Sequence, residues 1–70
     1  MEQIDISSEQ YRIYSYEDNK FCKIENPLTL YVTENGTHRI VDAQGLTHRP
    51  SPGYLLISWL PKEGAPNFVA

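Results

Sequence analysis

Residues 28–60, LTLYVTENGTHRIVDAQGLTHRPSPGYLLISWL, contain three runs of apolar, β-branched and aromatic residues separated by two turn sequences. Runs of this composition are typical of β-strands. Asn35-Gly36 supplies two residues that tolerate positive φ, as a type I′ hairpin turn requires. Residues 42–45, Asp-Ala-Gln-Gly, have the form of a type I turn that ends in a glycine bulge. The stretch therefore predicts an antiparallel β-meander.

Residues 11–16 and 21–25 predict a further hairpin, with a two-residue turn at Asp18-Asn19. The cross-strand pairs of this register are Glu17 with Lys20, Ile13 with Ile24, and Arg12 with Glu25. Each pair is favourable, which supports the register. One face of the hairpin then carries Tyr11, Ile13, Cys22 and Ile24, and the other carries Arg12, Tyr14, Tyr16, Phe21, Lys23 and Glu25.

The dipeptide Asn26-Pro27 separates this hairpin from the next strand. Proline cannot adopt the positive φ of a tight primed turn, so the chain is predicted to turn a corner here rather than form a hairpin. Corners of this kind let short β-proteins close a core. Residues 50–53, Pro-Ser-Pro-Gly, are predicted to form a loop, and the tail at residues 67–70 is predicted to pair with residues 55–59.

These elements predict an all-β fold, a small antiparallel meander of five or six strands curled into a barrel or half-barrel. Residues 11–70 form the single small β domain, and residues 1–10 form a mobile N-terminal arm or a short edge strand. The predicted core consists of Ile13, Ile24, Leu28, Leu30, Val32, Val41, Leu55, Ile57 and Trp59, with Trp59 at its centre.

Composition limits the classes of function. Seventy residues build only a marginal core, so homodimerisation is one way to complete it. The single cysteine excludes an internal disulfide, and the lack of a signal-like segment or a long apolar run predicts a cytoplasmic protein with no membrane contact. Residues 19–70 carry four acidic and five basic residues, and this balance disfavours strong nucleic-acid binding.

No sequence motif of an enzyme, a cofactor site or a phosphate-binding loop occurs, so we predict a protein that is not an enzyme and has no catalytic residues and no cofactor. Cys22 is predicted to fill the core. His38, Asp42 and His48 fall on one face of the predicted meander and could ligate zinc or nickel. A structural role is favoured, with Asp42 accepting backbone hydrogen bonds in its own turn, so no metal site is predicted.

Two arginines are predicted to face each other across the hairpin that contains the Asp42–Gly45 turn. If Asp42 pairs with Leu46, then Ile40 faces His48 and Arg39 faces Arg49. Like charges directly opposite destabilise a ladder unless an anion lies between them, although exposed side chains can instead extend into water. Arg39 and Arg49 are therefore candidate binding residues for an anion.

The second candidate surface is the predicted hairpin face with alternating aromatic and basic residues, Arg12, Tyr14, Tyr16, Phe21 and Lys23. Tyrosine and arginine are enriched in protein interfaces, and the near-neutral domain favours a protein partner. The sequence thus predicts a non-catalytic protein-interaction module whose partner it does not identify. The alternative is a small β-barrel that binds single-stranded nucleic acid by stacking bases on these rings.

The order of the segments NPLTL (26–30), HRIVDAQGLTH (38–48), PGYLLISW (52–59) and PNFVA (66–70) resembles small uncharacterised proteins of bacterial phages and prophages. The resemblance implies no activity and supplies no site residues. It implies a compact bacterial or phage accessory protein that acts by binding a host or phage component.

Overall fold

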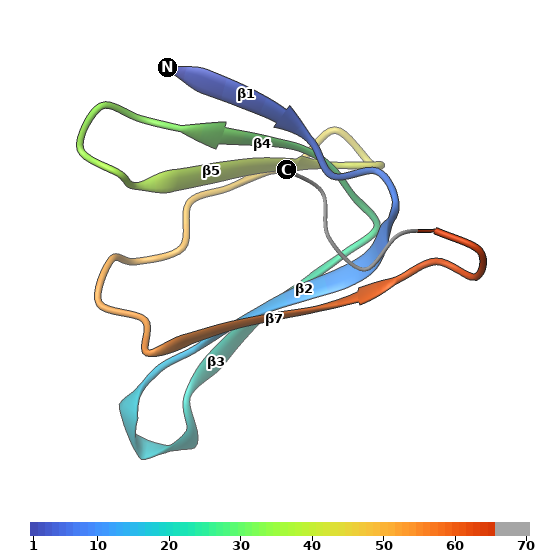
Figure 1. The fold of residues 1–70 in the computed structure, drawn as a ribbon. Helices are drawn as coiled ribbons and strands as arrows, with labels where there is room; N and C mark the ends of the chain where they lie inside the picture. The colour runs from blue at the N-terminus through green and yellow to red at the C-terminus, as the bar shows by residue number, and fades with distance from the viewer. Residues whose placement is uncertain (66–70) are drawn as a thin grey trace.

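The strands in the computed structural model, which describes residues 1–65, belong to two antiparallel sheets (Figure 1). The four-stranded sheet has the order β1-β4-β5-β6, and the three-stranded sheet has the order β3-β2-β7. Their bounds are β1 (Glu2–Asp5), β2 (Glu9–Ser15), β3 (Phe21–Glu25), β4 (Pro27–Val32), β5 (His38–Asp42), β6 (Thr47–His48) and β7 (Leu56–Pro61). The predicted all-β class is confirmed. The described part of the chain has seven strands, however, and its sheets do not close into a barrel.

The two turns of the four-stranded sheet have the same geometry. In the β5–β6 turn, Asp42 donates its N–H to the carbonyl of Leu46 at 3.0 Å, and Gly45 has φ 85°. This is the predicted glycine bulge, and the predicted pairing of Ile40 with His48 is confirmed. In the β4–β5 turn only Gly36 has positive φ. The prediction of a type I′ turn is therefore wrong, because a three-residue loop, 34–36, connects the strands.

The β2–β3 hairpin differs from the prediction by one residue. Its loop, Glu17–Asn19, is one residue longer than the predicted turn, and both Asp18 and Asn19 take positive φ. Arg12 consequently pairs with Ile24, not with Glu25. Because side chains alternate along a strand, this shift moves every residue of β3 to the opposite face.

Two short connections carry the chain from one sheet to the other. Asn26, with φ 50°, forms the predicted corner between β3 and β4, and residues 6–8 form a similar corner between β1 and β2. Residues 49–55 then cross back, so β7 pairs with β2 rather than extending the meander (Figure 1). The meander prediction thus holds for β4, β5 and β6 and is wrong for β7. The predicted pairing of residues 67–70 lies outside the described residues.

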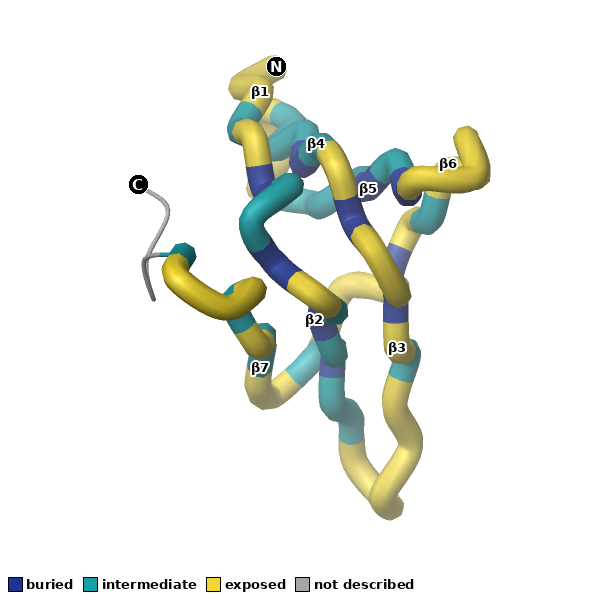
Figure 2. The backbone as a smooth tube through the Cα atoms, turned by 90° about the vertical axis from the view of Figure 1, so that its right-hand side faces the viewer, coloured by how far each residue is buried: buried dark blue, intermediate teal, exposed yellow. Residues whose placement is uncertain are grey.

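The core lies between the inner faces of the two sheets, where Figure 2 shows buried residues along β2, β3, β4 and β5. Its buried apolar residues are Ile6, Tyr14, Ile24, Leu30 and Ile40. Ile24 and Leu30 were predicted. Val32 and Ile57, also predicted, are half-buried and pack against this cluster.

The other core predictions place residues on the wrong face or at the wrong depth. The shifted register turns Ile13 outward, and Val41 alternates with buried Ile40, so both are half-buried on outer faces. Leu28, at the bulge between Pro27 and Thr29, and Leu55, before β7, are exposed. The predicted central residue, Trp59, is also only half-buried.

Candidate functional site

A chain of polar side chains crosses the interior between the sheets. Arg12 donates from Nε and Nη2 to the two carboxylate oxygens of Glu9, at 2.9 and 2.8 Å. Its Nη1 donates to the hydroxyl oxygen of Tyr14 at 3.4 Å, and that oxygen lies 2.7 Å from Nδ1 of His38. Because a guanidinium can only donate, the Tyr14 oxygen accepts from Arg12, and its proton is free to be donated to His38.

Burial and hydrogen bonds shift the pKa values of Arg12 and Tyr14 in this row of polar side chains. Burial lowers the pKa of Arg12, but the hydrogen bonds to Glu9 and Tyr14 outweigh it and raise the pKa overall. Burial also raises the pKa of Tyr14, so the hydroxyl keeps its proton. Glu9 and Tyr14 are 1% and 0% exposed, so solvent and ligands do not reach these two side chains. The chain of polar groups therefore serves the structure and fixes how the sheets meet.

Aromatic rings surround the row of polar side chains where it ends at His38. The Tyr14 ring makes edge-on contacts with His38 and Tyr54, whose ring centres lie 5.7 and 5.0 Å away. Burial of the imidazole, followed by repulsion from the Arg12 guanidinium, lowers the pKa of His38 below its usual value of 6.5. Neutral His38, with Nδ1 as the acceptor, is the form that fits this environment.

The lowered His38 pKa makes stability depend on pH below neutrality. Well above about pH 6.5 the imidazole is neutral in both the folded and unfolded states. As the pH falls below that value, the unfolded state takes up the proton first, so the free energy of unfolding should decrease. We expect urea denaturation of the wild type to show a lower free energy of unfolding at pH 5.5 than at pH 7.5. In His38→Gln the free energy of unfolding should decrease less over the same pH range. An equal loss in both proteins would contradict the assignment.

The other histidine has a local role. His48 Nε2 lies 2.8 Å from one carboxylate oxygen of Asp42, and the other oxygen accepts backbone hydrogen bonds from Gln44 and Leu46. The bond to His48 is the main cause that lowers the pKa of Asp42. His38 is bonded to Tyr14 instead, and no group of three potential metal ligands occurs within residues 1–65.

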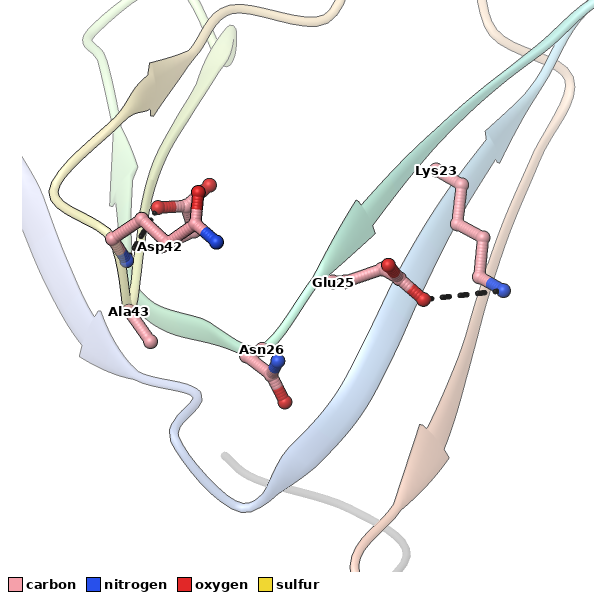
Figure 3. Close-up of a pocket in the computed structure, with 6 residues that line it drawn as sticks. Lys23, Glu25, Asn26, Asp42 and Ala43 are labelled. Atoms are coloured by element: carbon pink, nitrogen blue, oxygen red, sulfur yellow. Dashed lines mark hydrogen bonds and ion pairs between the residues drawn. The ribbon is translucent and has the colours of Figure 1, made fainter.

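A hollow of about 250 Å³ lies where the Asp42 turn meets the Asn26 corner (Figure 3). Ala43 donates its N–H to the carbonyl of Asn26 at 2.9 Å across this junction. Lys23 and Glu25 form an ion pair at 3.7 Å at the rim, while the Asp42 carboxylate is already saturated by its own turn. The charged groups that line this hollow therefore already have partners.

A second hollow, of about 390 Å³, opens where the chain leaves β6. We call it the arginine cleft, and it is lined by Thr37, His38, Arg39, Arg49, Pro50, Ser51 and Pro52. Its lining contains no carboxylate. Arg39 and Arg49, which the sequence predicts to face each other, both belong to this lining.

The outward side of the three-stranded sheet, which we call the outer face, presents three rows of side chains across β3, β2 and β7. The rows are Phe21–Ser15–Leu56, Lys23–Ile13–Ser58 and Glu25–Tyr11–Leu60. Phe21, Leu56 and Leu60 are 66%, 59% and 43% exposed. A hollow of about 340 Å³ beside small Ser15 is lined by Ile13 and Phe21. These exposed apolar side chains make the outer face a candidate interaction surface.

The register shift divides the aromatic and basic face predicted from the sequence. Arg12 and Tyr14 point inward and are buried, whereas Phe21 and Lys23 lie on the outer face. Tyr16 is half-buried, and its hydroxyl donates to the carbonyl of Ser51 at 2.8 Å. The five residues therefore do not form one surface.

Sequence reasoning missed several residues that define these sites. Glu9 was treated as part of a polar arm, although its spacing of three from Arg12 permits an ion pair. Leu56 and Leu60 were not assigned to a surface. Their alternation with the predicted core residues Ile57 and Trp59 was a readable signal for the outward side of β7. The bond between Tyr14 and His38 joins residues 24 positions apart and has no local signal.

Comparison of the chain with protein-family models, curated proteins and solved structures finds no match. The resemblance to small phage and prophage proteins stays a prediction. Residues 1–65 include no helix that is long and apolar enough to cross a membrane.

Proposed function

We propose that this protein is a protein-interaction module that acts by binding and whose outer face packs against a second copy of the chain. The observation that carries the proposal is the exposure of Phe21, Leu56 and Leu60 on one face of one sheet. Burying such side chains is the main favourable contribution to protein association.

The charge of the outer face fits a second copy. Its ionisable side chains near neutral pH are Lys23 and Glu25, which form an ion pair. Two copies can therefore meet at this face without net repulsion, although each chain carries a net charge of −3. A twofold interface must be complementary to itself, and an apolar face with one charge of each sign meets that requirement.

The size of the core supports the same conclusion. The hydrophobic core of the described domain consists of five buried residues, which is few for independent stability. Lys23 also lies 4.6 Å from the centre of the Tyr11 ring, so the polar end of the face is held in place. Packing a second copy on the outer face would add Ile13 and Tyr11 to a buried apolar layer.

Charge insertion on the outer face tests the proposal. We expect the wild type to form a dimer in sedimentation equilibrium, and Leu56→Glu or Phe21→Glu to weaken it by at least about tenfold. Leu46→Glu is the matched control, because Leu46 is 58% exposed but lies in the β5–β6 turn. This variant should dimerise like the wild type. All three substituted side chains are exposed, so the circular dichroism of the variants should stay native.

A wild type that stays monomeric at all concentrations would overturn the proposal, as would equal weakening by Leu46→Glu and Leu56→Glu. Binding of single-stranded nucleic acid remains the alternative, and it lacks structural support because Tyr14 is buried and the outer face has no excess of cations. Salt-sensitive binding of an oligonucleotide by a monomeric wild type would favour that alternative.

A further inference from the structure

The arginine cleft is separate from the outer face and shares no residue with it. The β5–β6 ladder ends at the pair Ile40–His48, and the next residues along the two strands are Arg39 and Arg49. Among residues 1–65, neither arginine has an ion-pair or hydrogen-bond partner for its guanidinium. Two unpaired guanidiniums side by side repel each other, and a shared anion removes this cost.

The opposite wall of the cleft is held by contacts to the three-stranded sheet. Pro50 is buried, and the carbonyl of Ser51 accepts the hydrogen bond from Tyr16. The Tyr16 ring in turn lies edge-on to Tyr54, with the ring centres 6.5 Å apart. Pro50 and Pro52 also restrict the backbone on either side of Ser51. A wall fixed in this way costs little entropy when a ligand binds.

His38 also belongs to the cleft lining, but its ring is held on the inner side of β5 by the bond from Nδ1 to the Tyr14 hydroxyl. The neutral imidazole therefore carries its proton on Nε2, and its signals report on events in the cleft. The lining of the cleft contains two arginines and no carboxylate. Guanidinium groups bind phosphate oxygens through paired, charge-assisted hydrogen bonds.

We propose that the arginine cleft is a binding site for a phosphate group, carried by the free ion or by a phosphomonoester. The ligand would lie between Arg39 and Arg49, against the wall formed by residues 50–52. The site operates in the monomer and does not depend on packing of the outer face.

Titration with inorganic phosphate, monitored by NMR at constant ionic strength with chloride, tests the site. We expect saturable shifts of Arg39, Arg49 and His38 signals in the wild type. Arg49→Gln and Arg39→Gln should each weaken binding by about tenfold or more. Lys62→Gln removes the same charge outside the cleft and should bind like the wild type.

The His38 signal provides a second readout. A bound anion opposes the repulsion from Arg12, so saturating sulfate, which does not itself titrate near neutral pH, should raise the pKa of His38 in the wild type and not in Arg49→Gln. Equal responses of Arg49→Gln and Lys62→Gln, or shifts that chloride reproduces, would overturn the proposal. Phenyl phosphate distinguishes a phosphomonoester from the free ion. Tighter binding of phenyl phosphate than of phosphate assigns the site to a monoester, and equal binding assigns it to the free ion.

Discussion

Replacement of Arg12 by methionine is expected to lower the free energy of unfolding by about 3–5 kcal/mol, because it leaves the Glu9 carboxylate buried without its partner. A loss of this size is comparable to the total stability of a small domain. The variant should therefore be largely unfolded at 25 °C. Urea denaturation followed by fluorescence of Trp59, whose ring centre lies 5.3 Å from the Arg12 guanidinium, measures the loss.

Two further variants isolate the cause. The double variant Glu9→Leu with Arg12→Met removes both charges and should recover most of the stability, because an apolar pair can replace a buried ion pair at little cost. Lys23→Met breaks the exposed pair with Glu25 and should change the free energy by less than about 1 kcal/mol. A double variant no more stable than Arg12→Met would show that the loss comes from packing of the arginine chain and not from the unpaired carboxylate.

Tyr14→Ala is expected to cost about 3–5 kcal/mol, because it empties the largest fully buried side-chain position in the domain. Tyr14→Phe keeps the ring but leaves Arg12 Nη1 and His38 Nδ1 without their shared partner, and should cost about 1–3 kcal/mol. The hydroxyl of Tyr11 has no hydrogen-bond partner among residues 1–65, so Tyr11→Phe is the control and should be nearly neutral. Equal stabilities of Tyr14→Phe and Tyr11→Phe in urea denaturation would mean that the bond to His38 contributes nothing.

Most of the strands and the positions of the turns could be predicted from local sequence, because their signals lie within a few residues. The types of the turns at Asn35-Gly36 and Asp18-Asn19 could not, because each loop contains one residue more than the sequence predicted. Asp42 and Gly45 predict the glycine bulge turn between β5 and β6. Asn26-Pro27 excludes a tight hairpin turn between β3 and β4 and so predicts the corner. The same turn brought Arg39 opposite Arg49, so this part of the candidate cleft followed from the sequence. Its second wall did not, because it depends on a hydrogen bond from Tyr16, 35 residues away.

The faces of the β2–β3 hairpin could not be read in this way. Both registers give acceptable cross-strand pairs, and the choice between them depends on what the inner face buries. In the observed register Arg12 meets Glu9 across the bulge in β2, and Tyr14 meets His38 from the other sheet. These contacts are not local, and charged residues such as Arg12 are rarely assigned to a core. The pairing of β7 with β2 likewise joins strands far apart in the sequence and has no local signal.

Packing of the outer face against a second copy is tested most directly by methyl NMR spectra of the wild type over a dilution series. We expect the methyl signals of Ile13, Leu56 and Leu60 to shift with protein concentration, because these side chains enter the interface. Leu46 is as exposed as Leu56 but lies in the β5–β6 turn, so its methyl signals should stay constant. Constant signals from all four residues, or equal shifts of Leu46 and Leu56, would contradict the proposed interaction surface.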